Sequence, residues 1–331
     1  MKICVAGDGA WGTALALNAL ENRHRVVIWG AFPDYLEEMR QTRENKKFLP
    51  GVKLPESLEF EADIRKALKD CSIIICATPT QFLRSVLKKM AGNLPQDVII
   101  VNVAKGIELD SWLRISQVIA EELGQVNYVD LSGPSHAEEV ARRVPTAVTV
   151  AGENPENAEF VQKALMNSNF RIYTSSDVLG LELGGAIKNV FAIAAGIIDG
   201  MQLGDNPKAA LMARGIAEMG RLGEALGGNR ATFSGLSGIG DLIVTCCSGH
   251  SRNRHVGEEL GRGKKLDEIL QAMGMVVAEG VPTAKGIRVL ARQAGVEIPI
   301  IDEVCKVLYE NRSAQEAMIS LMTRSAKNEE E

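Results

Sequence analysis

A lysine stands in the middle of a long apolar stretch of this sequence. Lys188 lies within residues 181–196, which are otherwise rich in Leu, Ile, Ala and Gly. Such a lysine must reach solvent through its stem, pair with another group, or occupy a polar pocket. Desolvation lowers the pKa of a lysine, and a lysine poised near neutral pH can act as a general acid or base. The segment alone leaves both interpretations open, a snorkelling lysine and an acid–base group.

Two downstream segments offer groups that could work with such a lysine. Asp241 follows a glycine-rich run and precedes an apolar stretch, so it could cap a helix or pair with Lys188. Ser251 has the sequence context of a helix N-cap, with Arg252 and Asn253 in the first turn. Backbone N–H groups at a helix start, together with a guanidinium, form a good phosphate site. The alternative for this second segment is a solvated basic turn.

Two loops that follow predicted strands carry further polar groups. Lys105 lies in the loop at 102–106, and the loop at 132–137 contains Ser and His residues. Both loops lie at carboxyl ends of strands, where ligands bind in open α/β sheets. No histidine in the chain is flanked in a way that suggests metal ligation, so we expect no metal. We interpret His136, His250 and His255 as peripheral to the site.

The element that must hold a cofactor beside these groups is at the N-terminus. Gly7, Gly9 and Gly12 fit the GxGxxG spacing between an apolar run at 2–6 and a helical pattern that leads into a second run at 25–29. This context predicts a βαβ unit that binds the pyrophosphate of a dinucleotide at the helix start. An NAD site usually carries an acid at the end of the second strand, and an NADP site carries basic residues there.

This chain has no charge at the end of its second strand. Trp29 is followed by Gly30, Ala31 and Phe32, and Asp34 comes several residues late. The segment therefore does not decide between NAD and NADP.

The rest of the chain divides into two regions with different sequence patterns. Apolar runs near 73–77, 98–101, 128–131, 147–151 and 170–173 alternate with helical patterns. This alternation predicts a Rossmann-type, doubly wound, mostly parallel sheet covered by helices on both faces. Beyond residue 178 the apolar runs typical of strands give way to residues that start or end helices. These are Asn206-Pro207, Gly227-Gly228, Pro282, Pro299 and the capping box Ser313 to Glu316. We therefore expect an α/β dinucleotide-binding domain at 1–178, an all-α substrate domain at 179–326 and a frayed tail at 327–331.

Composition narrows the class of protein. The 331 residues carry a net charge of −5, which argues against nucleic-acid binding through phosphate neutralisation. The six cysteines form no CxxC pair and fit free thiols in a reducing cytoplasm. No signal-peptide pattern precedes the first strand. The apolar stretch at 181–200 contains charges and many small residues, which indicates a buried, closely packed helix and no membrane span.

Taken together, these motifs resemble the bacterial NAD(P)-dependent glycerol-3-phosphate dehydrogenase family over nearly the whole chain. The segments that carry the resemblance are GDGAWGTALA, NVAKGIE, LSGPSHAEEV, LELGGAIKN, GDNPKAALMARGIAEMGRLG, FSGLSGIGDLIVTC and SRNRHVG. The resemblance implies interconversion of sn-glycerol 3-phosphate and dihydroxyacetone phosphate with NAD or NADP, and supply of glycerol phosphate for phospholipid synthesis. It also implies a cytoplasmic protein without a membrane span or nucleic-acid partner, and a homodimer.

The resemblance further implies roles at matching positions. Lys188 would be the catalytic proton donor and acceptor, with Lys105 and Asp241 as its partners. The positions implied for substrate binding are Lys105, Gly133, Ser135, Lys188, Asn189, Asp241, Thr245, Ser251, Arg252 and Asn253. Those implied for the nucleotide are Gly7, Gly9, Ala10, Trp11, Gly12, Ala31, Lys105, Ala137, Arg252, Val277 and Glu279.

The chain departs from the family at two places. Family members often have His or Arg where Ala31 and Phe32 stand, which puts NADP preference in doubt. Ala10 replaces a common serine of the glycine loop, which removes one hydroxyl from the phosphate site. Two other functions compete with this interpretation. A sister reductase for a non-phosphorylated hydroxy acid is disfavoured by Arg252 at a helix start, and a DNA-binding redox sensor is disfavoured by the acidic composition.

Overall fold

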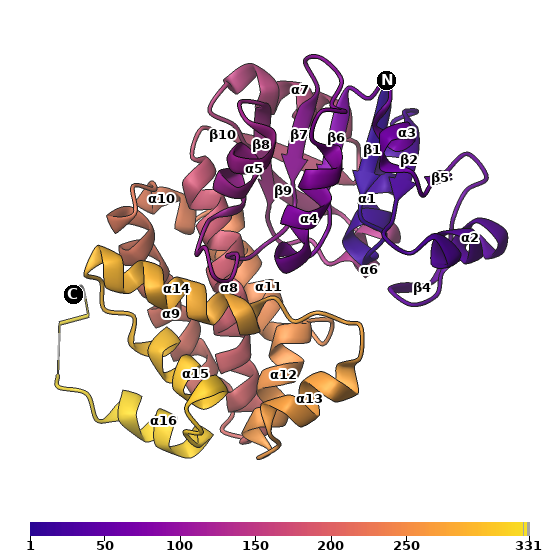
Figure 1. The fold of residues 1–331 in the computed structure, drawn as a ribbon. Helices are drawn as coiled ribbons and strands as arrows, with labels where there is room; N and C mark the ends of the chain where they lie inside the picture. The colour runs from indigo at the N-terminus through magenta and orange to yellow at the C-terminus, as the bar shows by residue number, and fades with distance from the viewer. Residues whose placement is uncertain (327, 330–331) are drawn as a thin grey trace.

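The chain folds into two halves that meet along the first turns of one long helix. The structure is a computed structural model that describes residues 1–326 and 328–329. Figure 1 shows the N-terminal half as a sheet flanked by helices and the C-terminal half as a group of helices below it. This architecture confirms the predicted fold class. The division into domains at 178 stays a prediction; the helix α8 (Val178–Gly200) begins at that residue.

The N-terminal half contains one eight-stranded sheet. Its strands are β1 (Lys2–Ala6), β2 (Arg25–Trp29), β5 (Glu59–Glu61), β6 (Ile73–Cys76), β7 (Ile99–Asn102), β8 (Asn127–Ser132), β9 (Thr146–Ala151) and β10 (Phe170–Ser175). They lie in the order β10-β9-β8-β7-β6-β1-β2-β5. All neighbours pair in parallel except β8 and β9, which are antiparallel. The sheet is therefore mostly parallel, as the alternation of apolar runs and helices predicts.

Helices cover both faces of this sheet. One hydrophobic cluster joins the sheet to α1 (Ala10–Glu21), α6 (Ala137–Ala141) and α7 (Pro155–Leu165). A second cluster on the other face includes α3 (Ile64–Leu68), α4 (Thr80–Met90) and α5 (Ile115–Leu123). Burial on both faces explains why the central strands are continuously apolar.

In the excursion between β2 and β5 a helix was predicted, from the helical pattern at 34–40, but two short strands were not. The excursion contains α2 (Pro33–Thr42) and the antiparallel pair β3 (Glu44–Asn45) and β4 (Leu49–Lys53). Its strands are short, and β4 contains Pro50 and Gly51, so they carry little apolar periodicity. Asn45 fixes the excursion to the glycine turn, because its Nδ2 donates to the Asp8 carbonyl and to Thr13 Oγ1, each at 2.8 Å.

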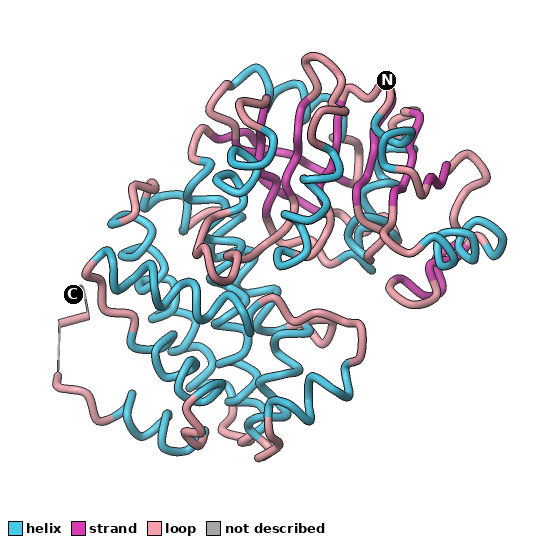
Figure 2. The backbone as a smooth tube through the Cα atoms, in the orientation of Figure 1, coloured by secondary structure: helices cyan, strands magenta, loops and turns pink. Residues whose placement is uncertain are grey.

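The described residues of the C-terminal half after β10 form helices joined by loops, with no strand among them (Figure 2). Its elements after α8 are α9 (Asp205–Ala225), α10 (Arg230–Phe233), the π-helical turn η1 (Leu236–Gly240), α11 (Asp241–Cys247), α12 (Arg252–Gly261), α13 (Leu266–Met273), α14 (Gly280–Ala294), α15 (Pro299–Tyr309) and α16 (Ala314–Met322). Helix α8 is long and apolar enough to span a membrane, but 94% of its most apolar window is buried inside the fold. The prediction of a buried, central helix is confirmed.

Glycines let α8 and α12 pack backbone to backbone. A Cβ added at Gly196 would lie 1.9 Å from the Arg254 carbonyl oxygen, and one added at Gly257 would lie 1.9 Å from the Ile193 carbonyl oxygen. No larger residue fits at either position without moving a helix. The contact fixes α12, and with it the turn at 251–253, against the helix that carries Lys188.

Some predicted helix boundaries differ from the structure. Asn206 and Pro207 lie inside the first turn of α9, because Gly204 is its N-cap. Pro282 is the third residue of α14, whose N-cap is Glu279. Of the predicted frayed tail, Lys327 and residues 330–331 lie outside the described residues.

Candidate active site

The side chain of Lys188 is buried where the two halves meet. It lies near the middle of α8 and is 7% exposed. Its Nζ donates to Asp241 Oδ1 and, at 2.9 Å, to Thr245 Oγ1. The interpretation of Lys188 as a snorkelling lysine is therefore wrong. Its ammonium is held by polar groups inside the protein.

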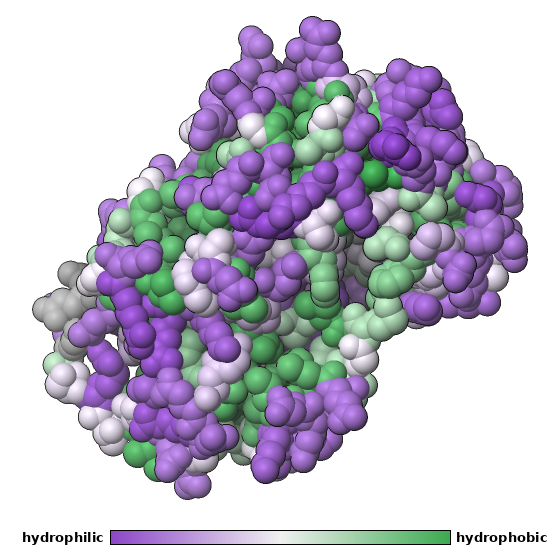
Figure 3. Space-filling view, viewed as in Figure 1, coloured by the Kyte–Doolittle hydropathy of each residue, from purple (hydrophilic) through white to green (hydrophobic). Residues whose placement is uncertain are grey.

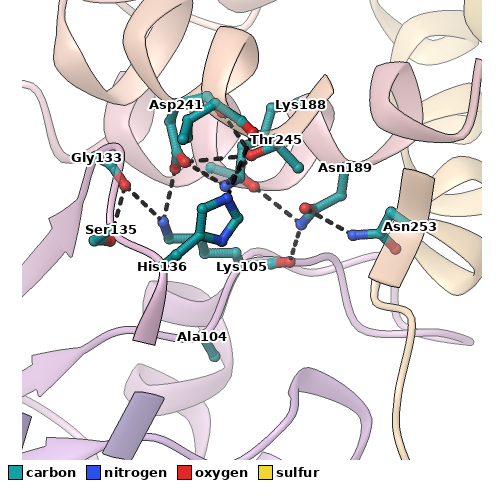
Figure 4. A network of polar contacts seen from close by, with 12 residues as sticks. Ala104, Lys105, Gly133, Ser135, His136, Lys188, Asn189, Asp241, Thr245 and Asn253 are labelled. Carbon is teal, nitrogen blue, oxygen red and sulfur yellow. Dashed lines mark hydrogen bonds and ion pairs between the residues drawn. The ribbon is translucent and has the colours of Figure 1, made fainter. Parts of the chain in front are cut away.

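Asp241 binds two ammonium groups with its two oxygens. Oδ1 accepts from Lys188, and Oδ2 accepts from Lys105 Nζ at 2.7 Å. Lys105 comes from the loop after β7 and also donates to the Gly133 carbonyl at 3.2 Å. Asp241 begins α11, but its side chain forms no helix cap. Figure 4 shows the carboxylate between the two lysines, with Gly133 on the sheet side.

Burial and these charges shift the pKa of both partners. Desolvation lowers the pKa of Lys188 to about 8; Asp241 opposes this shift, and Lys105 adds to it. Burial acts to raise the pKa of the Asp241 carboxyl, but Lys105 and Lys188 together hold it below its usual value. Asp241 therefore stays ionised at neutral pH, while Lys188 can exist in either protonation state.

A chain of amides connects α8 to the turn at 251–253. Asn189 Nδ2 donates to the Lys105 carbonyl at 3.1 Å, and its Oδ1 accepts from Asn253 Nδ2 at 2.9 Å. Asn253 Oδ1 in turn accepts from the Gly280 N–H at 2.9 Å. Ser251 caps α12, as predicted, with its Oγ accepting from the Arg254 N–H. The exposed Arg252 donates to the Val277 carbonyl at 3.1 Å.

The loop after β8 closes the site on the sheet side. Gly133 has φ of +149°, and a Cβ there would lie 2.9 Å from the Val148 Cα, so glycine is required. Ser135 Oγ donates to the Gly133 carbonyl at 2.9 Å. His136 is closer to the reactive groups than we expected: Figure 4 shows its ring beside the Lys188–Asp241 contact. Burial, and then the charge of Lys188, lower the pKa of His136.

The glycine turn has the shape of a dinucleotide cradle. Gly7 has φ of +136° and meets the Ala77 backbone, and a Cβ at Gly12 would lie 2.3 Å from the Gly7 carbonyl oxygen. Nothing lies within 4 Å of a Cβ built at Gly9, so that face is open. Gly9 is the N-cap of α1 and provides no side-chain cap. Trp11 Nε1 is buried without a hydrogen-bond partner in the described structure. The open face at Gly9 and the uncapped N–H groups at the start of α1 fit a bound pyrophosphate.

The other predicted nucleotide positions surround the same junction. Ala10 and Ala137 begin α1 and α6, and Ala31 is exposed just beyond β2. Glu279 Oε1 accepts from the Thr80 N–H at 2.9 Å, and burial raises the pKa of this carboxyl.

Sequence reasoning missed the turn at 77–80, which touches both Gly7 and Glu279. It directly follows β6, so the rule for carboxyl ends of strands could have found it. Figure 3 shows apolar residues gathered along the junction of the two halves, bordered by hydrophilic surface. A cavity of about 640 Å³ between α9, α15 and α16 has none of the site residues in its walls.

Comparison with known proteins identifies the family. The model for the NAD-dependent glycerol-3-phosphate dehydrogenase N-terminus matches residues 2–158, and the model for the C-terminus matches residues 177–319. The chain belongs to this family. It is therefore an oxidoreductase with a Rossmann-type NAD(P) domain.

Individual relatives are similar over their whole lengths. Glycerol-3-phosphate dehydrogenase [NAD(P)+] of Bacillus pumilus is 50% identical, across 100% of this chain and 96% of the relative. The protein of the same name from Syntrophomonas wolfei is 48% identical, across 99% and 96%. The crystal structure of glycerol-3-phosphate dehydrogenase from Coxiella burnetii superposes with a TM-score of 0.94 at 36% identity, covering 98% of this chain and 99% of that one.

Proposed function

We propose that this dehydrogenase interconverts dihydroxyacetone phosphate and sn-glycerol 3-phosphate, with Lys188 as its general acid and base. The observation that carries the proposal is the buried Asp241 carboxylate between Lys188 and Lys105. The names and full-length similarity of the relatives support the substrate pair. A lysine with a pKa of about 8 suits both directions of a reversible proton transfer.

The residues of the glycine turn would hold the cofactor, with its pyrophosphate at the start of α1. A nicotinamide dinucleotide bound there supplies or accepts the hydride. We propose that the further nucleotide contacts come from Ala10, Trp11, Ala31, Lys105, Ala137, Arg252, Val277 and Glu279.

In the reductive direction the residues of the protein deliver one proton to the substrate. As the carbonyl carbon of dihydroxyacetone phosphate gains a hydride, its oxygen gains the proton from Lys188 Nζ. Lys188 is then a neutral amine, still within reach of Asp241 and Thr245, and regains a proton from solvent. In the oxidative direction the neutral amine removes the hydroxyl proton. Lys105 places a second amino group near the developing alkoxide.

The phosphate of the substrate would bind at the start of α12. Arg252 offers a guanidinium, and Ser251 and Asn253 flank it in the same turn. The hydrogen bond between Asn253 and Asn189 connects this turn to the residue next to Lys188. Gly133 and Ser135 contact the substrate from the sheet side in this proposal, which leaves its carbonyl facing Lys188.

A Lys188→Met variant tests the role of the lysine. Oxidation of NADH and of NADPH, each with dihydroxyacetone phosphate, is measured side by side for the native protein and the variant. Loss of a general acid costs about 10²–10⁴-fold in rate. Full turnover by Lys188→Met would contradict the assignment, and no turnover by the native protein with either cofactor would contradict the substrate.

The remaining parts of the proposal concern the cell and the assembly. We propose that the protein acts in the cytoplasm as a homodimer and supplies glycerol phosphate for phospholipid synthesis. Light scattering at working concentration measures the assembly. Depleting the protein in its native cell, with glycerol withheld and then supplied, tests the supply of phospholipid precursor.

A further inference from the structure

No acidic side chain follows directly at the end of β2, but a carboxyl group from another loop packs against this strand end. Gly7 donates its N–H to the Trp29 carbonyl at 2.8 Å, which brings the glycine turn against the last residue of β2. Asp8, the residue between the first two glycines of the motif, therefore lies beside Gly30. Ala31 and Phe32 follow and are exposed.

The contact between Asp8 and Gly30 is close and involves the carboxyl group. A Cβ built on Gly30 would lie 2.6 Å from Asp8 Oδ2 and 2.8 Å from Asp8 Cγ. Gly30 has no positive φ, so its backbone conformation does not demand glycine. The side chain of Asp8 is what requires glycine at position 30. Its carboxyl group fills the space in which a side chain at position 30 would begin.

The carboxyl group lacks a partner for one oxygen. Asp8 Oδ2 is buried and accepts no hydrogen bond from any group in the described part of the chain. Burial raises the pKa of Asp8, while Lys47 acts to lower it. The Lys47 ammonium itself lies 4.2 Å from the centre of the Tyr35 ring. A buried carboxylate oxygen without a partner is costly, which suggests that a donor from a ligand completes the site.

We propose that Asp8 replaces the missing acid at the end of β2 and makes this dehydrogenase select NAD(H) over NADP(H). In Rossmann-type sites an acid at the end of the second strand binds the adenosine ribose hydroxyls, and basic residues there accept the 2′-phosphate of NADP. Here the carboxyl group comes from the first loop of the motif, and no basic residue occupies positions 30–32. Its negative charge favours a ribose with free hydroxyls and opposes a 2′-phosphate.

This inference rests on the proposed function only for the class of cofactor. Its first test is therefore binding without substrate. Protein fluorescence quenching gives the Kd of NADH and of NADPH for the native chain, Asp8→Asn and Asp34→Asn. Asp34 is the matched control, because it is an exposed acid just beyond the same strand.

We expect the native chain to bind NADH more tightly than NADPH. Asp8→Asn should shift the ratio of the two dissociation constants toward NADPH by about 10- to 100-fold, the range set by like-charge repulsion at a binding site. Asp34→Asn should leave the ratio unchanged. Equal or tighter binding of NADPH by the native chain overturns the proposal, as does an equal shift in both variants.

A relocated acid tests the geometry. Gly30→Asp alone should disrupt binding, because its Cβ would meet the Asp8 carboxyl. In the double variant Asp8→Gly/Gly30→Asp the carboxyl group moves to the strand end, and the preference for NADH should return. Failure of this variant to favour NADH, in protein with native circular dichroism, would also overturn the proposal. If NADH binds as expected but dihydroxyacetone phosphate gives no turnover, the proposed substrate fails while the assignment of Asp8 stands.

Discussion

As the pH rises, the rate of reduction should fall and the rate of oxidation should rise, and both changes should have the same midpoint. The group responsible is Lys188, whose pKa is lowered to about 8 chiefly by desolvation. In the proposed mechanism, reduction of dihydroxyacetone phosphate requires the protonated form of Lys188, and oxidation of glycerol 3-phosphate requires its neutral form. The reductive rate is therefore lost, and the oxidative rate gained, as the pH rises through that value.

The size of the effect follows from the titration. With a pKa of about 8, Lys188 is about 90% protonated at pH 7 and about 10% protonated at pH 9. We expect kcat/KM for oxidation to rise, and kcat/KM for reduction to fall, by about tenfold each over this interval. The substrate phosphate does not interfere, because its second pKa of about 6 lies below the window.

Initial rates in both directions from pH 6.5 to 9.5 at constant ionic strength provide the measurement. Asp241→Asn removes the charge that opposes the lowering of the Lys188 pKa, so the residual oxidative activity should show a midpoint below that of the native protein. A flat oxidative profile in the native protein, or a midpoint that moves upward in Asp241→Asn, would refute the assignment of Lys188 as the titrating base.

Three further predictions concern binding and stability. Arg252→Ala should raise the KM for dihydroxyacetone phosphate strongly, whereas the exposed Arg262→Ala at the far end of α12 should not; a change confined to the nucleotide KM would contradict the phosphate assignment. Gly257→Ala forces a Cβ to within 1.9 Å of the Ile193 carbonyl and should lower the free energy of unfolding by about 1–3 kcal/mol in urea titrations. Burial raises the pKa of Glu218 from 4.5 to about 7, so the native protein should lose about 3 kcal/mol of stability as pH rises through this range. Glu218→Gln should abolish this loss, and an unchanged pH profile would show that Glu218 is not the cause.

The N-terminal motif was predictable because its signals are local. The three glycines, the flanking strands and the helix start all lie within about thirty residues, and each has its own physical reason. The pairing direction of β9 was not predictable in the same way. An apolar run that is buried on both faces has the same sequence pattern whether it pairs in parallel or antiparallel, so only the connections decide.

The partners within the site could be suggested but not placed from sequence. Lys188 and Asp241 are 53 residues apart, and their contact depends on how α8 and α11 pack. Asp8 was overlooked for a related reason. The pattern GxGxxG treats its second position as free, and the uncharged segment after β2 left the cofactor undecided. The compensation between Asp8 and Gly30 appears only when two neighbouring strand ends are brought together.

The charge balance of the site explains why three elements must converge on it. A lysine buried alone would be neutral and a poor acid, and a lysine paired with one carboxylate would hold its proton too firmly to serve as a base. Here Asp241 raises the pKa of Lys188, and burial and Lys105 lower it, which leaves the value near 8. Two ammonium groups on one carboxylate also leave a net positive charge. That excess suits a phosphorylated substrate and an alkoxide that forms during reduction, and it exists only when α8, α11 and the loop after β7 meet.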